Sequence, residues 1–351
     1  MRKPNRHCAA GSGVSDDTGG PIVRLHGSQS SNGAHGETHR AGPASMRGRS
    51  IGTSPSRVPI LSIDIGIATA GRPAVVGDTI EALLAQERAP ETLLVCPAEP
   101  SDVDVARIPR QLPRRLISSD RGLTAQRNAL IEASDADIIL FLDDDFLPAP
   151  DFLAEVERLF ASDPSIVVAT GAVLADGILT AGLDFQQAQR IIRAAGENRG
   201  GAPEEVHNAY GCNMAIRLAP VREHRLRFDT ALPLYGWLED VDFSRQLAPH
   251  GRIVKSARLR GVHLGTKRSG RTPGKRLGYS QIANPVYLAR KGTLSWPRAF
   301  NQIARNLTAN FARSPRPEPW VDRKGRLSGN FRALAELTTG RLEPSRIYDI
   351  D

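Results

Sequence analysis

The sequence lacks paired cysteines, a long apolar run and a hydrophobic leader. Its three cysteines, Cys8, Cys96 and Cys212, are odd in number and far apart, which argues against a disulfide framework or a zinc site and favours a reducing compartment. No run approaches the roughly 18 consecutive apolar residues that span a bilayer. The start of the chain is basic and rich in Gly and Ser, without the apolar core of an export signal. We therefore expect neither a secreted disulfide protein nor an integral membrane protein.

Acidic residues are missing from one long segment. Residues 243–317 contain no Asp or Glu but 16 Lys and Arg, although the net charge of the 351-residue chain is only +8. The rest of the chain has 30 basic and 38 acidic residues. A basic segment on an otherwise acidic protein predicts an anionic partner, which could be phosphate groups, a membrane surface or nucleic acid.

The chain divides into three parts by composition. Residues 1–57 carry few large apolar side chains and no helix or strand period, so we predict a disordered segment, with Met46 as an alternative start. Residues 58–265 are predicted to form the catalytic domain. Residues 266–351 are predicted to form a basic loop followed by a helical extension.

Strands and helices alternate in the middle part. The predicted strands have continuous apolar runs, and the predicted helices have apolar residues on one face. The strands are expected at residues 59–66, 92–96, 137–142 and 166–170, and the helices at 75–86, at 122–134 and from Pro150. Strands of this kind, alternating with helices, predict an α/β fold with one mostly parallel sheet covered on both faces.

The strongest chemical signal is three adjacent carboxylates, Asp143, Asp144 and Asp145, directly after a buried strand. Open α/β sheets bind ligands at this end of their strands. Like charges this close together raise one pKa or attract a cation, and a hard divalent ion is the natural partner of oxygen ligands. The simpler interpretation is an acidic turn that caps the helix expected near Pro150.

Two further groups of residues suggest chemistry. A helix expected to begin near Glu239 has Asp240 and Asp242 in its first turn, where acids also stabilise the positive helix end. Asp240, beside an aromatic loop, is the better candidate for a general base. Trp237 in that loop could stack on a ligand or lie in the core.

His263 is followed by a Gly-rich basic loop that could hold an anion. A structural histidine and a solvated loop are the simpler alternatives. The basic residues of the loop are Lys267, Arg268, Arg271, Lys275 and Arg276.

Taken in order along residues 59–264, these motifs resemble the family-two glycosyltransferases of the GT-A fold. Thr69 and Arg72 stand in a loop similar to the family's first nucleotide loop. Residues 120–128 (DRGLTAQRN) resemble its G-L-S-x-A-R-N segment, and residues 211–217 (GCNMAIR) resemble its G-x-N-x-A-x-R segment. The acids 143–145 resemble the DxD motif, Glu239-Asp240 the ED pair, and His263 the late histidine of the metal site.

The resemblance implies an inverting, metal-dependent enzyme that moves one sugar from a nucleotide-sugar to an acceptor hydroxyl in cell-surface or exopolysaccharide synthesis. It implies a UDP-linked donor and a glycan or lipid-linked acceptor. Mg²⁺ or Mn²⁺ would be held by Asp145 and His263, with Asp240 as the catalytic base. The other implied site residues are Thr69, Arg72, Asp120, Arg127, Asp143 and Asp144 for the donor, Asn213, Trp237 and Glu239 for the acceptor side, and Lys267, Arg268 and Arg271 for the diphosphate.

The sequence departs from the family pattern in two places. Cys96 and Pro97 end the second strand where an acidic residue usually reads the base, and Ala70-Gly71 replaces Tyr-Asn in the first loop. These departures leave open which nucleobase the donor carries. The Q-x-x-R-W motif of processive synthases is absent, which favours transfer of a single sugar.

Two alternatives belong to other classes of protein. A sugar-phosphate nucleotidyltransferase shares the sheet and the strand-end acids, but the Gly-rich Arg-Lys signature expected after its first strand is absent. A nucleic-acid-binding protein would use the basic segment and leave the acidic motifs without a role.

Residues 292–313 form a basic amphipathic stretch in the extension. Its apolar residues have roughly helical spacing and are interleaved with Arg298, Arg305 and Arg313. The stretch is predicted either to pack on the catalytic domain or to rest on the cytoplasmic face of the membrane.

Overall fold

The structure is a computed structural model that describes residues 60–196, 200–266 and 273–350. Val58–Asp351 forms one compact unit. The predicted disordered segment 1–57 and the basic loop residues 267–272 lie outside the described residues.

Within these residues nine strands form one sheet in the order β3-β2-β1-β4-β8-β6-β9-β5, with β7 paired to β9. The strands are β1 Ile63–Thr69, β2 Leu93–Pro97, β3 Arg114–Leu116, β4 Ile138–Asp143, β5 Phe146–Pro148, β6 Ile166–Asp176, β7 Glu204–Glu205, β8 Asn213–Arg217 and β9 Arg252–His263. The pairings give β1, β2, β3, β4, β6 and β9 one direction and β5, β7 and β8 the other. The predicted α/β fold with a mostly parallel sheet is confirmed.

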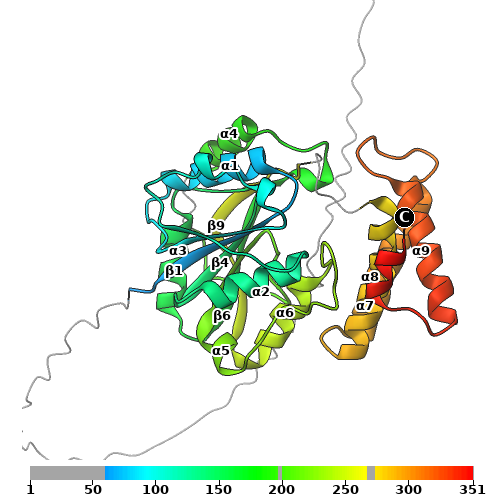
Figure 1. Cartoon of the computed structure of the whole chain (residues 1–351). Coiled ribbons are helices and arrows are strands. Elements are labelled where there is room, and N and C mark those ends of the chain that lie inside the picture. The colour runs from blue at the N-terminus through cyan, green and yellow to red at the C-terminus, as the bar shows by residue number, and fades with distance from the viewer. Residues whose placement is uncertain (1–59, 197–199, 267–272, 351) are drawn as a thin grey trace, which may run out of the picture. The chain divides into compact units, whose positions relative to one another are not determined.

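Helices cover both faces of this sheet (Figure 1). In Figure 1, α1 and α3 lie on one face, and α2, α5 and α6 lie on the other. The helices of this part of the chain are α1 Pro73–Ala82, α2 Leu123–Ala133, α3 Phe152–Ser162, α4 Phe185–Ala195, α5 Leu218–Glu223 and α6 Glu239–Leu247.

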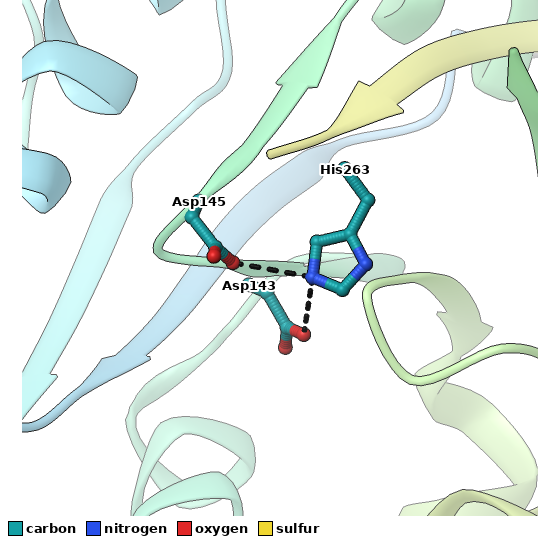
Figure 2. A group of neighbouring side chains, drawn as sticks. All are labelled: Asp143, Asp145 and His263. Atoms are coloured by element: carbon teal, nitrogen blue, oxygen red, sulfur yellow. Dashed lines mark ion pairs between the residues drawn. The ribbon is translucent and has the colours of Figure 1, made fainter. Parts of the chain in front are cut away.

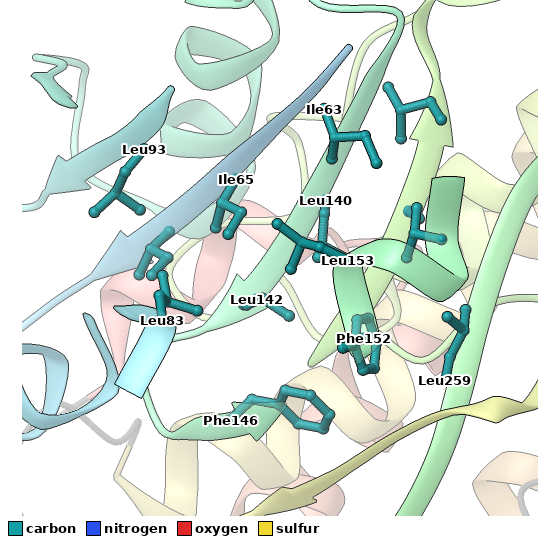
Figure 3. Close-up of a cluster of buried hydrophobic side chains, with 14 of the residues drawn as sticks. Ile63, Ile65, Leu83, Leu93, Leu140, Leu142, Phe146, Phe152, Leu153 and Leu259 are labelled. Atoms are coloured by element: carbon teal, nitrogen blue, oxygen red, sulfur yellow. The ribbon is translucent and has the colours of Figure 1, made fainter. Parts of the chain in front are cut away.

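Alternation along the buried strands divides the core into two layers. Ile63, Ile65 and Ile67 of β1 belong to a cluster with side chains of α1 and α3, part of which Figure 3 shows. Ile139 and Phe141 of β4 point to the opposite face and pack with α2, α5 and α6. Successive side chains of a strand point to opposite faces, so a strand that is apolar throughout needs a helix on each side.

Several boundaries differ from those predicted. β1 continues to Thr69, so the first loop is shorter than the sequence suggested. The helix predicted over residues 75–86 ends at Ala82 in a 3₁₀ turn, which leaves Leu84 exposed rather than buried. β6 extends to Asp176 because it pairs with β9 almost to its end, a partner that local sequence does not reveal.

Three longer helices follow the sheet: α7 Gly274–Lys291, α8 Trp296–Arg313 and α9 Arg323–Thr338. Tyr279, Ile282 and Ala333 lie in the small apolar core that they share with the C-terminal turn. Among the described helices, none combines the length and the apolar character needed to cross a bilayer.

The prediction of one apolar helical stripe over residues 292–313 is wrong in detail. Gly292, with a φ of 92°, ends α7, and Leu294 is buried in the connection before α8 begins. On α8, Phe300 and Phe311 are 61% and 68% exposed. Part of the apolar character of α8 is therefore presented to solvent.

The acid-free segment is partly neutralised inside the fold. Basic residues of this segment pair with acids that lie outside it in the sequence. These pairs are Arg252 with Asp163 and Glu205, Arg260 with Asp151, Lys291 with Asp229 and Asp242, and Arg313 with Glu318. Part of the positive charge of this segment is therefore used in ion pairs within the protein, and only the rest is available for an external anionic partner.

Gly329 of α9 provides a test of how closely α7 and α9 pack. A Cβ at this position would overlap the backbone oxygen of Lys275 in α7. Gly329→Ala should lower stability by up to about 2 kcal/mol, because overpacking costs about 1–3 kcal/mol and Ala gains only roughly 1 kcal/mol over Gly in a helix. Thermal unfolding measures the effect. Ser328→Ala, an exposed neighbour, is the control and should leave the melting temperature unchanged or slightly raised; an equal result for both variants would contradict the close packing.

Candidate active site

The site lies where several parallel strands end together. Parallel pairing sets Ala68 of β1 opposite Asp143 of β4, so these two strands end side by side. The same holds for β6 and β9, whose pairing ends with Asp176 opposite His263. Carboxyl ends of parallel strands meet at one edge of a sheet, which is where α/β folds bind ligands.

The end of β4 and the turn that follows it bring Asp143 and Asp145 against His263 of β9. β5 begins at Phe146 and pairs antiparallel with β9, with Phe146 opposite His263. The backbone N–H of Leu264 donates to the carbonyl of Asp145 over 2.9 Å. This pairing brings His263 against an acidic turn that lies more than a hundred residues earlier in the chain.

Asp143, Asp145 and His263 form a cluster that can hold a metal ion (Figure 2). One ligand atom from each lies within 4.8 Å of the others. Nε2 of His263 is 3.2 Å from Asp145 and 3.7 Å from Asp143. Two carboxylates and one imidazole at this spacing fit a divalent cation such as Mg²⁺ or Mn²⁺.

A second layer of residues orients the histidine. Nδ1 of His263 lies 3.1 Å from Asp176, and the same carboxylate accepts a hydrogen bond from the hydroxyl of Tyr210 over 2.9 Å. A carboxylate behind the second ring nitrogen is the usual support of a metal-binding histidine, because it fixes the tautomer and the ring direction. The donor set and its support therefore both suit a metal site.

The pKa values show what the cluster does without a metal ion. Burial lowers the pKa of His263, but Asp145 and Asp176 outweigh it and raise that pKa to about 10. Burial likewise opposes ionisation of Asp145, but His263 and Arg72 hold the pKa of that carboxyl well below its usual range. A proton on His263 thus occupies the place that a cation would take.

Asp144 points away from this cluster. It accepts a hydrogen bond from Thr69 over 2.6 Å and pairs with Arg72, which also lies 3.2 Å from Asp145. Burial raises the pKa of Asp144 to about 7, with Asp145 adding to the effect and Arg72 opposing it. The middle acid therefore anchors the loop after β1 to the acidic turn.

Arg127 was predicted to bind the donor, and the structure gives it other partners. Its side chain is only 2% exposed, pairs with Glu239 at 2.5 Å and donates to the carbonyl of Gly211 over 2.8 Å. Its guanidinium carbon lies 5.4 and 5.5 Å from the ring centres of Phe141 and Phe228. The guanidinium is thus committed to protein groups, which suits positioning rather than contact with a phosphate.

The carboxylates of Asp240 and Glu239 differ in their burial and in their partners. Glu239 is buried against Arg127, and burial raises the pKa of this glutamate well above its usual value although Arg127 opposes the shift. Asp240 is half-buried and accepts hydrogen bonds from the backbone N–H groups of Gly211 and Val241 over 3.0 and 2.8 Å. Burial raises the pKa of Asp240, and these hydrogen bonds oppose the rise.

The remaining predicted residues divide between the site and its surroundings. Asn213 was assigned to the acceptor side, but it is 1% exposed and its side-chain oxygen accepts from Thr170 and from the backbone N–H of Gly171. It therefore joins β8 to β6 inside the sheet. Asp120 is exposed in the connection between β3 and α2, and Trp237 is half-buried just before α6. Lys267, Arg268 and Arg271 lie outside the described residues.

Three contributors were not predicted. Asp176 could have been found by the same strand-end rule that singled out the acidic turn, had the strand been extended correctly. Tyr210 precedes the GCNMAIR segment and carries no signal of its own. Gln126 lies within the DRGLTAQRN segment and donates to the carbonyls of Thr69 and Cys96 over 3.1 and 2.6 Å, which joins the ends of β1 and β2.

Residues 62–257 match the family described as glycosyltransferase like family 2. No curated protein matches the chain. Among solved structures, S. aureus TarS is 13% identical with a TM-score of 0.47, and the match covers 65% of this chain but only 40% of TarS. The Pyrobaculum calidifontis mannosyltransferase PcManGT, in complex with GDP-Man and Mn²⁺, is 15% identical with a TM-score of 0.48, covering 82% of this chain and 85% of that one. GalNAc-T7, with UDP, GalNAc and Mn²⁺, is 14% identical with a TM-score of 0.47, covering 81% and 59%.

Metal binding should displace the proton from His263. Its pKa of about 10 keeps the metal-free imidazole protonated near neutral pH, whereas an imidazole that binds a metal ion must be neutral. We expect Mn²⁺ binding between pH 6.5 and 8 to release about one proton, and the affinity to rise by up to about tenfold per pH unit. Titration calorimetry in buffers of different ionisation enthalpy measures the proton. His263→Gln should bind Mn²⁺ weakly without this release, whereas the exposed control His250→Gln should behave as wild type; binding without proton release in the wild type would refute the assignment.

Proposed function

Because the chain belongs to the glycosyltransferase like family 2, we propose that it transfers one sugar from a nucleotide-sugar to an acceptor hydroxyl in a single, inverting displacement. The observation that carries this proposal is the convergence of the Asp143, Asp145 and His263 cluster and the carboxylate of Asp240. Asp143 is close enough to Asp240 to raise its pKa further. The backbone N–H of Asp143 donates to the carbonyl of Cys212, and that of Gly211 donates to Asp240, so the cluster and the candidate base both adjoin residues 211–212.

The three cluster residues would hold Mg²⁺ or Mn²⁺ against the donor diphosphate. A bound divalent cation supplies positive charge that stabilises the departing nucleoside diphosphate. Asp145 directly precedes β5 and His263 ends the neighbouring β9, so the two side chains would bind the ion from adjacent strands. Asp176 would keep the imidazole turned toward the ion.

Asp240 would remove the proton from the attacking hydroxyl. Two backbone N–H groups fix the direction of its carboxylate, and burial makes it a stronger base than an exposed aspartate. Glu239 is less suited to the role, because its carboxyl is buried and paired with Arg127. In this proposal Arg127 acts by holding Glu239 and Gly211, and through them the start of α6.

The donor would lie along the ends of β1 and β2. Thr69 and Arg72 hold the acidic turn at this edge, which supports a place for them beside the nucleotide. Asp120 follows β3 at the same edge of the sheet. Lys267, Arg268 and Arg271 stay proposed ligands of the diphosphate, and a UDP-linked donor stays a prediction.

We place the acceptor, a glycan or a lipid-linked sugar of a surface polysaccharide, at the cytoplasmic face of the membrane. Two features support this place. Nucleotide-sugar chemistry in a reducing compartment agrees with the free, buried thiols of Cys96 and Cys212. The ring centres of Trp296 and Phe300 on α8 lie 5.7 Å apart, and these residues are 45% and 61% exposed. The helix contains no acidic residue.

Turnover of a nucleotide-sugar panel that includes UDP-GlcNAc and GDP-mannose tests the function. Wild-type protein with Mn²⁺ or Mg²⁺ should release nucleoside diphosphate from one member, by hydrolysis when no acceptor is added, and EDTA should stop it. Asp240→Asn should lower kcat by about 100-fold or more and leave donor affinity near wild type, because a base contributes to the transition state and little to donor binding. Asp135→Asn, an exposed carboxylate, should have no effect.

Several outcomes would contradict this assignment. Release of pyrophosphate would indicate a nucleotidyltransferase, and a parallel loss of donor binding in Asp240→Asn would make Asp240 a donor-site residue. Asp242→Asn would be unsuitable as a control for Asp240→Asn, because Asp242 is fully buried and paired with Lys291.

The exposed aromatic residues of α8 should seat the enzyme on anionic vesicles. Burial of one large apolar side chain is worth about 1.5–3 kcal/mol, so the double change Phe300→Ser and Phe311→Ser should weaken vesicle binding by about 100-fold or more. Co-sedimentation with phosphatidylglycerol vesicles at several salt concentrations measures it. The double change Arg298→Gln and Arg305→Gln should reduce mainly the salt-sensitive part. If the wild-type protein does not bind anionic vesicles at low salt, the proposed contact with a membrane is wrong.

A further inference from the structure

The segment before α6 has an unusual backbone conformation. Leu234, Gly236 and Leu238 have φ angles of 58°, 62° and 74°. Leucine enters this left-handed region only where its surroundings enforce it. Because α6 begins at Glu239, the conformation of Leu238 sets the direction in which the first turn of the helix presents Asp240.

Both leucines pack against apolar clusters that contain side chains of α7. Leu238 packs against the apolar cluster that includes Leu288 and Ala289 of α7. Leu234 packs against the cluster that includes Tyr279 and Ile282 of the same helix. Both leucines with an unfavourable backbone conformation therefore pack into clusters to which one helix contributes side chains, and this helix begins more than thirty residues later in the chain.

A buried hydrogen bond adds to these contacts. The side-chain amide of Asn284, in the middle of α7, donates to the carbonyl of Trp237 over 2.8 Å. Asn284 is 1% exposed. A donor at this depth fixes the peptide between Trp237 and Leu238, since a buried carbonyl that loses its partner is costly.

The end of α7 holds α6 itself. Nζ of Lys291 lies 2.7 Å from Asp242, and the hydroxyl of Thr293 donates to the other oxygen of this carboxylate over 2.7 Å. Asp242 is fully buried and lies two residues after Asp240. Because α6 is clamped by Asp242 and its preceding segment by Asn284, α7 contacts the chain on both sides of Asp240.

We propose that α7 positions the catalytic base, with Asn284 and Lys291 as positioning residues for Asp240. The proposal rests on the proposed role of Asp240. Neither residue is among the groups that face the donor or the metal cluster. Their effect on the reaction would pass through the backbone of residues 237–242, and a small displacement of a reacting group is enough to slow a reaction by up to about 100-fold.

The test compares two positioning variants, a rescue variant and a matched control in the full-length protein. Asn284→Ala and Lys291→Gln should each lower kcat for release of nucleoside diphosphate by about tenfold or more. The donor Kd, measured by calorimetry with the nucleotide-sugar that is turned over, should stay within about twofold. Lys291→Arg should recover most of the rate. Arg290→Gln removes an exposed positive charge from the same helix turn and should leave kcat unchanged.

A double variant separates positioning from general destabilisation. In the Asp240→Asn background, Asn284→Ala should cause little further loss of kcat, because the base that it positions is already absent. A lower melting temperature with wild-type kcat, or a full additional loss in the double variant, would overturn the proposal. If Lys291→Gln does not fold, Asn284→Ala decides on the same readouts. If Asp240→Asn keeps its turnover, the proposed function is wrong. If Asp240→Asn is inactive while both α7 variants keep wild-type kcat, only the proposed role of α7 is wrong.

Discussion

Mutual repulsion among carboxylates at one edge of the sheet is the constraint on which the rest of this structure depends. Six of the described acids gather there: Asp143, Asp144, Asp145, Asp176, Glu239 and Asp240. Burial raises the pKa of Asp144 to about 7 and raises those of Glu239 and Asp240 as well. A site of this kind is stable only if positive charge is brought to it, and a divalent cation is the charge that the cluster is shaped to accept.

The protein supplies its own positive charges from three different elements. Arg72 precedes α1 and holds two acids of the turn, while Arg127 of α2 pairs with Glu239 at the start of α6. His263 at the end of β9 lies between the acidic turn and Asp176. Each cation joins segments that are far apart in the chain, so the same contacts that lower the repulsion also fix the geometry of the site. Electrostatic balance and site geometry are therefore one problem here.

The C-terminal helices take part in this arrangement. Lys291 of α7 neutralises the buried carboxylate of Asp242, and Asn284 holds the segment that leads into α6. This explains why a stretch without acids follows a domain that is rich in them: part of its positive charge is used inside the fold. The exposed aromatic residues of α8 lie in the same helical group, so the proposed surface contact and the proposed alignment of Asp240 belong to neighbouring elements.

The sequence alone determined the α/β fold, because uninterrupted apolar strands such as residues 137–142 can be buried only between two layers of helices. It also singled out Asp143, Asp145 and Asp240 as candidates, since acids after strands and in a first helical turn leave local patterns, and the family resemblance added His263. It could not determine which contacts those residues make. Arg127 and Asn213 belong to matching motifs, yet both are buried. Arg127 of α2 is held by Glu239 and Gly211, and Asn213 is held by β6, which lies beside β8 in the sheet. Asp176, Asn284 and Lys291 acquire their partners only when distant segments pack together, and local sequence carries no record of such long-range pairing.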